Sequence, residues 1–489
     1  MRSEGYAERN RIGFQIKEIK VMTNTESHDN NLIFGLEDNP PFQTAFLVSL
    51  QHVCVVFVPS VTPAILIGRA LDLDATSISY IIGMTLFVAG FATFVQARRI
   101  GLIGSGLLSI QGPSFAFLPP IFSVIAAGNA AGRTPEETLA LILGLGFFGS
   151  FIQIILSRFL QFAWVIFPPI VTGTAVTLIG LTLIRFGMHD MAGGDAAEAL
   201  GDYGSLRYWA VSLPVFLTVS VCSANSNRYL RMGSVIIGLI VGAIISIFMG
   251  MTDFSQLGSI PAFNVPIPFR FGLDFNFSTF IPFAIIYFAT SLEVIGDITA
   301  TSMVTGEPIS GTKYVKRLKG GLLGDGFNSF IASCCSTLPT VTLSQNNGII
   351  QLTGVGSRYI GFYVGGILAF LGLFPIIGGI LTAIPAPVFG AAIMLMFGTV
   401  AVAGFNILRE IEMTNRSLVI VGASLAAGLG VTYIPEALLG FPEQLRNVLE
   451  SGISVGSLCA LILNLVLPKS QSDRLAEESV SRPETSSIT

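Results

Sequence analysis

Three neighbouring carboxamides, Gln345, Asn346 and Asn347, are the residues whose types and spacing say most about chemistry in this chain. Carboxamides offer donors and acceptors together, which suits the edge of a planar heterocycle better than a metal ion or a phosphate. They lie between strongly apolar segments and directly precede Gly348, which we expect to break a helix. Because a polar, interrupted stretch at membrane depth is tolerated only where protein or a water-filled cavity covers it, the sequence predicts a binding site here.

Two carboxylates share one face of a helix predicted over residues 281–303. Glu293 and Asp297 are four residues apart, so both side chains point to the same side. A charged side chain at the bilayer centre costs about 2.5–3.5 kcal/mol on insertion scales, so each carboxylate needs a function or a partner. We predict that Glu293 accepts hydrogen bonds from a substrate. Asp297 either handles a proton or is held structurally by backbone amides or an arginine.

Asp325 and His52 are further ionisable residues within apolar segments. Asp325 is expected early in its helix, near a basic turn, so a salt bridge or a helix cap competes with a role in proton relay. A lone histidine on an apolar helix is usually a structural hydrogen-bonding residue. For His52 we therefore favour a supporting role over direct contact with a ligand.

Glycine and proline interrupt the stretch over residues 105–120, SGLLSIQGPSFAFLPP. Pro113 removes a backbone donor and Gly112 frees the backbone, so we expect extended geometry that offers N–H and C=O groups to a ligand. Ser114 adds a hydroxyl. Phe115 adds an aromatic face that could stack on a flat ring, although simple packing is an equal alternative because phenylalanine is common in this chain.

The composition places these residues in a membrane protein. Of 489 residues, 52% are hydrophobic and only 11% are charged, against about 25% charged in soluble domains. Apolar runs of about twenty residues, the length that spans a bilayer, recur from Phe46 to Pro468. A net charge of -4 without a basic stripe argues against nucleic acid as a partner. No catalytic motif and no cysteine or histidine metal spacing is present, so we expect neither an enzyme nor a metal or other cofactor.

The apolar runs predict an all-α polytopic protein of about fourteen membrane segments. Residues 105–120 and 339–353 are broken segments at matching positions of the two halves, the sign of an inverted repeat with its site at the midplane. Between them and beyond, we expect a loop over residues 185–203, a helix that starts at Gly320 after a basic turn, and a continuous helix over residues 377–400.

Three regions follow from the same pattern. Residues 1–42 are predicted to form a cytoplasmic tail, residues 43–468 the membrane domain and residues 469–489 a disordered cytoplasmic tail. Basic residues after the second segment and between Lys313 and Lys319 mark the cytoplasmic side, which sets a multi-pass orientation in a bacterial inner membrane with both termini inside.

At this point the motifs resemble the nucleobase–ascorbate transporter family, also called nucleobase–cation symporters of class two. The family signature is similar to Gln345-Asn346-Asn347-Gly348 followed, after four residues, by Thr353-Gly354. Further similar motifs cover most of the chain between residues 35 and 468, namely GLEDNPPFQTAFLVSLQH, GSGLLSIQGPSFAF, FPPIVTGTAVTLIGLTLI, SLEVIGDITATSMV and RLKGGLLGDG.

The resemblance implies a fold of about fourteen segments in two inverted repeats of seven, divided into a core and a gate domain. It places short antiparallel strands in segments three and ten, with the substrate between them and segment eight. Family members also tend to form homodimers through their gate domains.

Residue roles are implied by the resemblance as well. Glu293 and Gln345 would hold the polar edge of a base, Asn346 would support the site, and Phe115 would line it with the backbone around Ser114 and Ala116. The remaining matching positions are tied to proton coupling or to the support of the site, namely His52, Asp297, Asp325, Asn347 and Gly348.

The branch of the family sets the expected substrate. Glutamine at the first signature position and glycine at its last are similar to the xanthine and uric acid branch, whereas the uracil branch more often has glutamate first. Ser114 replaces an asparagine found in some xanthine-selective members, and a small hydroxyl residue is closer to members that accept uric acid.

We therefore predict import of xanthine and/or uric acid by proton symport, with the bilayer, protons and a second copy of the chain as partners. One charge crossing 100 mV yields about 2.3 kcal/mol, enough to hold roughly a fiftyfold gradient of a neutral substrate. The alternatives are a symporter of uracil or another nucleobase, an anion transporter of the same fold, an uncoupled facilitator, and a receptor.

Overall fold

The computed structural model describes residues 32–160, 169–227, 230–231, 233–252, 254, 258, 260–309, 311–343, 345–409, 411, 413–441, 449 and 452–468. Most of the predicted N-terminal tail and all of the predicted C-terminal tail lie outside these residues. Residues 32–38 are described, and they run along residues 354–358, where Ile33 N donates to Gly354 O at 2.7 Å.

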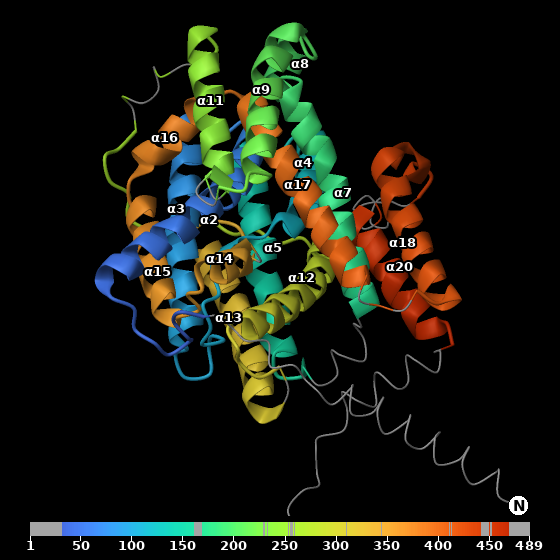
Figure 1. Cartoon of the computed structure of the whole chain (residues 1–489). Helices are drawn as coiled ribbons and strands as arrows, with labels where there is room; N and C mark the ends of the chain where they lie inside the picture. The colour runs from blue at the N-terminus through green and yellow to red at the C-terminus, as the bar shows by residue number, and fades with distance from the viewer. Residues whose placement is uncertain are drawn as a thin grey trace, which may run out of the picture.

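Helices make up nearly all of the described structure (Figure 1). In chain order they are α2 (Phe42–Ala70), α3 (Ala75–Arg98), α4 (Leu118–Ala130), α5 (Pro135–Leu156), α7 (Pro169–Met191), α8 (Gly194–Leu200), α9 (Leu206–Ser223), α11 (Ser234–Phe248), α12 (Phe277–Val304), α13 (Gly311–Cys334), α14 (Gln345–Thr353), α15 (Arg358–Gly372), α16 (Pro375–Ala383), α17 (Ala386–Arg409), α18 (Asn415–Tyr433) and α20 (Gly452–Val466). Two short 3-10 helices, η1 (Phe115–Phe117) and η3 (Pro435–Leu438), and two strands, β1 (Gln111–Pro113) and β2 (Thr340–Thr342), complete the described elements.

Within the described residues, seven helices are long and apolar enough to cross a membrane, and an eighth span results if α15 and α16, bent by 72°, are taken together. The chain is therefore a multi-pass membrane protein. The other predicted segments are shorter or more polar: α11 and α20 have 15 residues each, and α13 carries the basic residues between Lys313 and Lys319.

The helices pack in two groups. The first bundle contains α2, α3, α4, α5, α12, α13, α14, α15 and α16 together with η1 and the two strands, and the second contains α7, α9, α11, α17, α18 and α20. In Figure 1, α3, α15 and α16 lie on the left, whereas α18 and α20 lie on the right beside α7. The predicted site residues belong to the first bundle.

The two interrupted stretches meet as the short strands that the family resemblance implies. β1 pairs with β2 in antiparallel register, with Gln111 opposite Thr342 and Gly112 opposite Val341. Two hydrogen bonds extend the pairing, from Ser114 N to Pro339 O at 2.9 Å and from Leu343 N to Ile110 O at 2.8 Å. The backbone groups freed by interrupting a helix at this depth are thus satisfied by the other broken segment.

Glycine allows close packing around β1. A Cβ atom on Gly112 would lie 2.8 Å from Leu343 Cδ1 and 3.2 Å from Ser60 Oγ, so the neighbouring side chains would have to shift to admit it. The strand therefore packs directly against α2 through its backbone.

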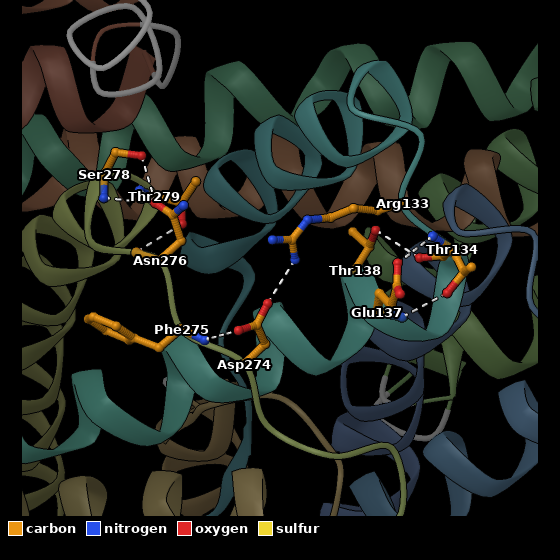
Figure 2. Close-up of polar contacts among 9 residues, drawn as sticks. All are labelled: Arg133, Thr134, Glu137, Thr138, Asp274, Phe275, Asn276, Ser278 and Thr279. Atoms are coloured by element: carbon orange, nitrogen blue, oxygen red, sulfur yellow. Dashed lines mark hydrogen bonds and ion pairs between the residues drawn. The ribbon is translucent and has the colours of Figure 1, made fainter.

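Polar caps fix the start of α5 and α12 (Figure 2). Thr134 and Glu137 form a reciprocal capping box at α5, and the side chain of Asn276 accepts from Ser278 N and Thr279 N at α12. Between them, Arg133 Nη1 lies 2.8 Å from Asp274 Oδ2. The hydrogen bond from Arg133 and one from Phe275 N hold the pKa of Asp274 below its ordinary value.

Four expectations about the elements are wrong. α14 runs through Gly348 without a break, because the interruption lies before it, between Cys334 and Gln345. The expected loop over residues 185–203 is largely helical, since α7 continues to Met191 and α8 follows. Residues 377–400 do not form one helix. Ile384 is extended ahead of Pro385, so α16 ends at Ala383 and α17 begins at Ala386.

The fourth wrong expectation concerns the start of α13, which is Gly311 rather than Gly320. Its first turns carry the basic residues, and two of them pair with Glu307: Lys313 Nζ at 2.8 Å and Arg317 Nη1 at 2.6 Å. Partial burial of Glu307 opposes ionisation, but the hydrogen bonds from Arg317 and Lys313 outweigh it and lower the pKa of this carboxyl. The cationic cluster is thereby tied to the turn after α12.

Candidate functional site

The candidate site lies where α12 meets the two broken segments, since α12 contacts η1, β2 and α14. Glu293 is half-buried on α12, and Asp297, one turn further along, is only 8% exposed. Asp297 and Asp325 lie close enough to Glu293 for electrostatic repulsion between the ionised carboxyls. The structure therefore brings together three carboxyl groups that the sequence singled out separately.

Asp325 lies in the middle of α13, not early in it, because the helix begins nine residues sooner than expected. The carboxyl is completely buried, and its Oδ1 atom accepts from Gln96 Nε2 at 3.1 Å. Gln111 and Thr342, partners in the strand pair, also approach it. Neither a salt bridge nor a cap is seen for Asp325 among the described residues, so the polar contacts of this carboxyl are with neutral side chains.

The strands and this carboxyl form one hydrogen-bonded group. Gln111 Nε2 donates to Thr342 Oγ1 at 2.8 Å, and Gln111 N donates to Thr93 Oγ1 at 3.0 Å. Gln96 Nε2 also donates to Gly321 O, and its Oε1 accepts from Ser105 N at 2.9 Å. We call Gln96, Gln111, Asp325 and Thr342 the Asp325 cluster. It joins α3, α13, β1 and β2.

Two of the three carboxamides hold the site together. Asn346 Nδ2 donates to Leu108 O at 2.5 Å, which ties α14 to the stretch before β1. Asn347 Oδ1 accepts from Thr301 Oγ1 at 2.7 Å, which ties α14 to α12. For Gln345 the structure describes the backbone, as the first residue of α14, but not the side chain. The side chain of Asn347 is thus engaged with α12.

His52 is completely buried on α2 and faces the carboxamide of Asn346. Although the two groups are neighbours, neither ring nitrogen nor Asn346 Oδ1 has a partner with good hydrogen-bond geometry among the described residues. This arrangement fits support of α14 by α2, which the sequence favoured over direct contact.

The stretch after β1 presents one polar and two apolar groups. The Ser114 hydroxyl is buried and has no hydrogen-bond partner among the described residues. Phe115 is half-buried and meets Phe397 of α17 edge to face, with ring centroids 5.5 Å apart. Ala116 is buried. Phe115 thus lies at the boundary between the two bundles.

Sequence reasoning missed several polar residues of the site, namely Gln96, Gln111 and Thr342. Each is a neutral hydrogen-bonding side chain in an apolar segment and buried in the structure. The signal that could have found them is energetic: a neutral polar side chain in an apolar segment is costly to bury unless it has a hydrogen-bond partner. Only the fold shows that their partners are one another and Asp325.

A multi-span helical protein with a buried polar site between two broken segments has the architecture of a membrane permease. Comparison with known proteins makes the class specific. The model of a family described as "Permease family" matches residues 43–437. The chain belongs to this family, the nucleobase–ascorbate transporters, and is a transporter rather than an enzyme. The resemblance found from the motifs is confirmed.

Several relatives are similar over almost their whole length. The xanthine permeases XanQ and XanP of Escherichia coli (strain K12) are 41% and 40% identical, each over 91% of this chain and 96% of the relative. A putative purine permease of Clostridium perfringens is 34% identical over 91% of this chain and 95% of its own length.

Solved structures support the fold alone, because their sequence identity is low. The transmembrane domain of the cyanobacterial bicarbonate transporter BicA superposes with a TM-score of 0.58 at 14% identity, covering 88% of this chain and all of that domain. The murine anion transporter Slc26a9, in its inward-facing state, gives 0.57 at 14% identity, with 88% of this chain and 69% of that one covered.

Proposed function

We propose that this permease imports a purine base, xanthine and/or uric acid, across the plasma membrane by proton symport. The relatives at 40–41% identity named as xanthine permeases support the substrate class. The observation that carries the coupling mechanism is the group of three carboxyls, of which Asp297 and Asp325 are buried and Glu293 is half-buried. Asp297 Oδ2 and Asp325 Oδ2 each have no hydrogen-bond partner among the described residues, and both carboxyls interact with Glu293.

This set of three carboxyls suits proton transfer for an electrostatic reason. Three ionised carboxylates this close in a buried site repel one another, so at least one gains by binding a proton. A substrate that donates hydrogen bonds to Glu293 changes this balance at Asp297 and Asp325. Proton binding and base binding are then linked, which is the requirement for symport.

Substrate recognition is assigned to groups around these carboxyls. Glu293 and Gln345 hold the polar edge of the base, and Phe115 covers one face of the ring system. The buried Ser114 hydroxyl supports this assignment, because a polar group without a protein partner at this depth is available to a ligand. Ala116 contributes backbone, and Asn346, Asn347, Gly348 and His52 keep α14 in place.

Transport requires the site to open alternately to each side. The first and second bundles correspond to the core and gate domains of the family, in about fourteen segments arranged as two inverted repeats of seven. The membrane domain is assigned to residues 43–468, with cytoplasmic termini at residues 1–42 and 469–489. Homodimerisation through the second bundle completes the proposal.

A second candidate is an anion transporter of the same fold. The fold similarity to bicarbonate and other anion transporters favours it. The residues nominated for the site are carboxyls, amides, a hydroxyl, an imidazole, an aromatic ring and small residues, with no lysine or arginine. This set suits a hydrogen-bonding heterocycle better than an inorganic anion, so we retain the purine.

The test is uptake of labelled xanthine and labelled uric acid into cells that express the chain, with and without a protonophore. We expect accumulation above equilibrium that collapses with the protonophore, and the better label identifies the preferred purine. Uptake that equilibrates and ignores the protonophore would instead indicate a facilitator. If neither labelled purine enters the cells but uracil or bicarbonate does, the chain transports one of those other substrates.

A further inference from the structure

A cavity of about 1600 Å³ lies between the two bundles, away from the predicted site. The ends of α2 and α4 line one side, and α7, α8, α9 and α17 line the other. Leu200, one of its lining residues, is 78% exposed, so the cavity opens at the surface. None of the predicted site residues is among its described lining residues. We call this space the vestibule.

A pair of stacked rings occupies the inner end of the vestibule. Phe122 of α4 and Phe186 of α7 have ring centroids 4.4 Å apart and planes inclined by only 21°. Both line the vestibule, and each comes from a different bundle. Along α4, Phe122 stands seven residues closer to β1 than Asn129, another lining residue. At 1.5 Å per residue this is about 10 Å deeper toward the site.

A second ring contact follows on the way to the site. Phe115, seven residues before Phe122, meets Phe397 edge to face across the same boundary between the bundles. The two contacts, Phe122–Phe186 and then Phe115–Phe397, therefore follow one another along the chain from the vestibule back to η1, which contacts α12. Both must separate if the bundles part along this line.

The chemistry of the outer pair matches a flat ring. Two nearly parallel aromatic faces from two separable bundles become the two walls of a slot when the bundles move apart, and stacking between such faces is tolerant of which base enters. The guanidinium carbon of Arg185 lies 4.7 Å from the Phe186 ring centroid on the vestibule, which adds a positive group beside the slot.

We propose that Phe122 and Phe186 form a transient stacking subsite through which the purine passes between the vestibule and the central site. This inference rests on the proposed function, and on the proposed orientation the vestibule is external. With the rings in contact the pair closes the path, and with the bundles apart the base lies between the two rings. The pair then sets how readily external purine is captured, without setting proton coupling.

The experiment measures initial uptake rates of the purine that the wild type accumulates, over a range of external concentrations. Phe186→Leu and Phe122→Leu each remove one stacking face but keep an apolar side chain. We expect either variant to raise the half-saturating concentration about fivefold or more while the maximal rate and the protonophore sensitivity persist. Phe186→Tyr keeps the aromatic ring, so its half-saturating concentration should equal that of the wild type.

Phe362→Leu is the matched control, because Phe362 pairs with Phe94 at 5.3 Å within the first bundle, far from the vestibule lining. Unchanged half-saturation in both leucine variants would overturn the subsite, as would an equal rise in Phe362→Leu or no recovery in Phe186→Tyr. If Phe186→Leu is absent from the membrane, Phe122→Leu decides. Failure of the proposed function is separate, because the wild type itself would then not accumulate purine.

Discussion

Two polar clusters tie helices of the first bundle together, and they differ above all in burial. The Asp325 cluster is completely buried, and its members bond to one another and to neighbouring buried groups such as Thr93 and the backbone of Gly321. The side chains of the pair Arg133–Asp274 near the start of α12 are 34% and 47% exposed. The neighbouring cap residues, drawn with the pair in Figure 2, are exposed as well. Water can replace lost partners at the second cluster but not at the first.

This difference in burial indicates a functional role for the Asp325 cluster and a structural role for the pair Arg133–Asp274. A buried carboxyl without a cationic partner is costly to keep ionised, so it persists where its protonation is used. An exposed ion pair costs little and contributes little. Changes at Asp325 and at Arg133 test this division directly. Two changes of intermediate expected effect test the packing of the strands and the contact between α12 and α14.

Replacement of Asp325 should have the largest effect. Asp325→Ala leaves the buried amide of Gln96 without one acceptor, which costs about 1–3 kcal/mol of unfolding free energy, and it removes the carboxyl itself. Asp325→Asn keeps the shape and is the matched variant. We expect both to abolish proton-driven accumulation, with Asp325→Asn closer to wild type in melting temperature. Wild-type accumulation by Asp325→Asn would contradict coupling through this carboxyl.

Gly112→Val should come next, because the added side chain would collide with Leu343 and Ser60 and push the strands apart. Overpacking of this kind costs about 1–3 kcal/mol, and uptake should fall with the displaced strand. Gly366→Ala on α15 is the control, since a Cβ there meets nothing within 4 Å. A thermal melt and an uptake assay measure both effects, and equal behaviour of the two variants would disprove the packing argument.

Thr301→Val should have a moderate effect confined to substrate affinity. It removes the donor to Asn347 but preserves side-chain volume, which loosens α14 by about 1 kcal/mol. That corresponds to roughly a fivefold rise in half-saturating purine. Ser302→Ala on the same helix loses only a bond to the carbonyl of Ile298 and serves as control. Equal half-saturation in the two variants would show that the contact between α12 and α14 does not matter.

Arg133→Ala should have the smallest effect, at most about 1 kcal/mol at neutral pH, because the pair is exposed. The sign of its pH dependence follows from Asp274, whose pKa is lowered in the folded state. Its stabilising contribution is present above the unfolded pKa and disappears as the pH falls through the folded pKa. Melting temperatures of wild type and variant should therefore converge in acid, and divergence there would contradict the assignment.

Apolar run lengths predicted the membrane class and the interrupted motifs led to the family, because both are local features of the sequence. The two strands were expected only through the resemblance to that family. The sequence placed Asp325, His52 and Asn346 in one site only through resemblance. It failed where long-range packing decides. Gly348 does not break α14, since a single glycine is tolerated in a helix whose first turn is anchored by Asn346 and Asn347. The neutral members of the Asp325 cluster became visible only once the strands were paired.

The most direct test of the central claim is accumulation of the preferred labelled purine in membrane vesicles under an imposed, inward-directed proton-motive force. For a neutral purine moving with one proton, 100 mV supports a concentration ratio of up to roughly fiftyfold. We predict that wild-type vesicles rise well above unity and that Glu293→Gln vesicles do not. A wild-type ratio that stays at unity, or wild-type accumulation by Glu293→Gln, would contradict purine symport through the buried carboxyls.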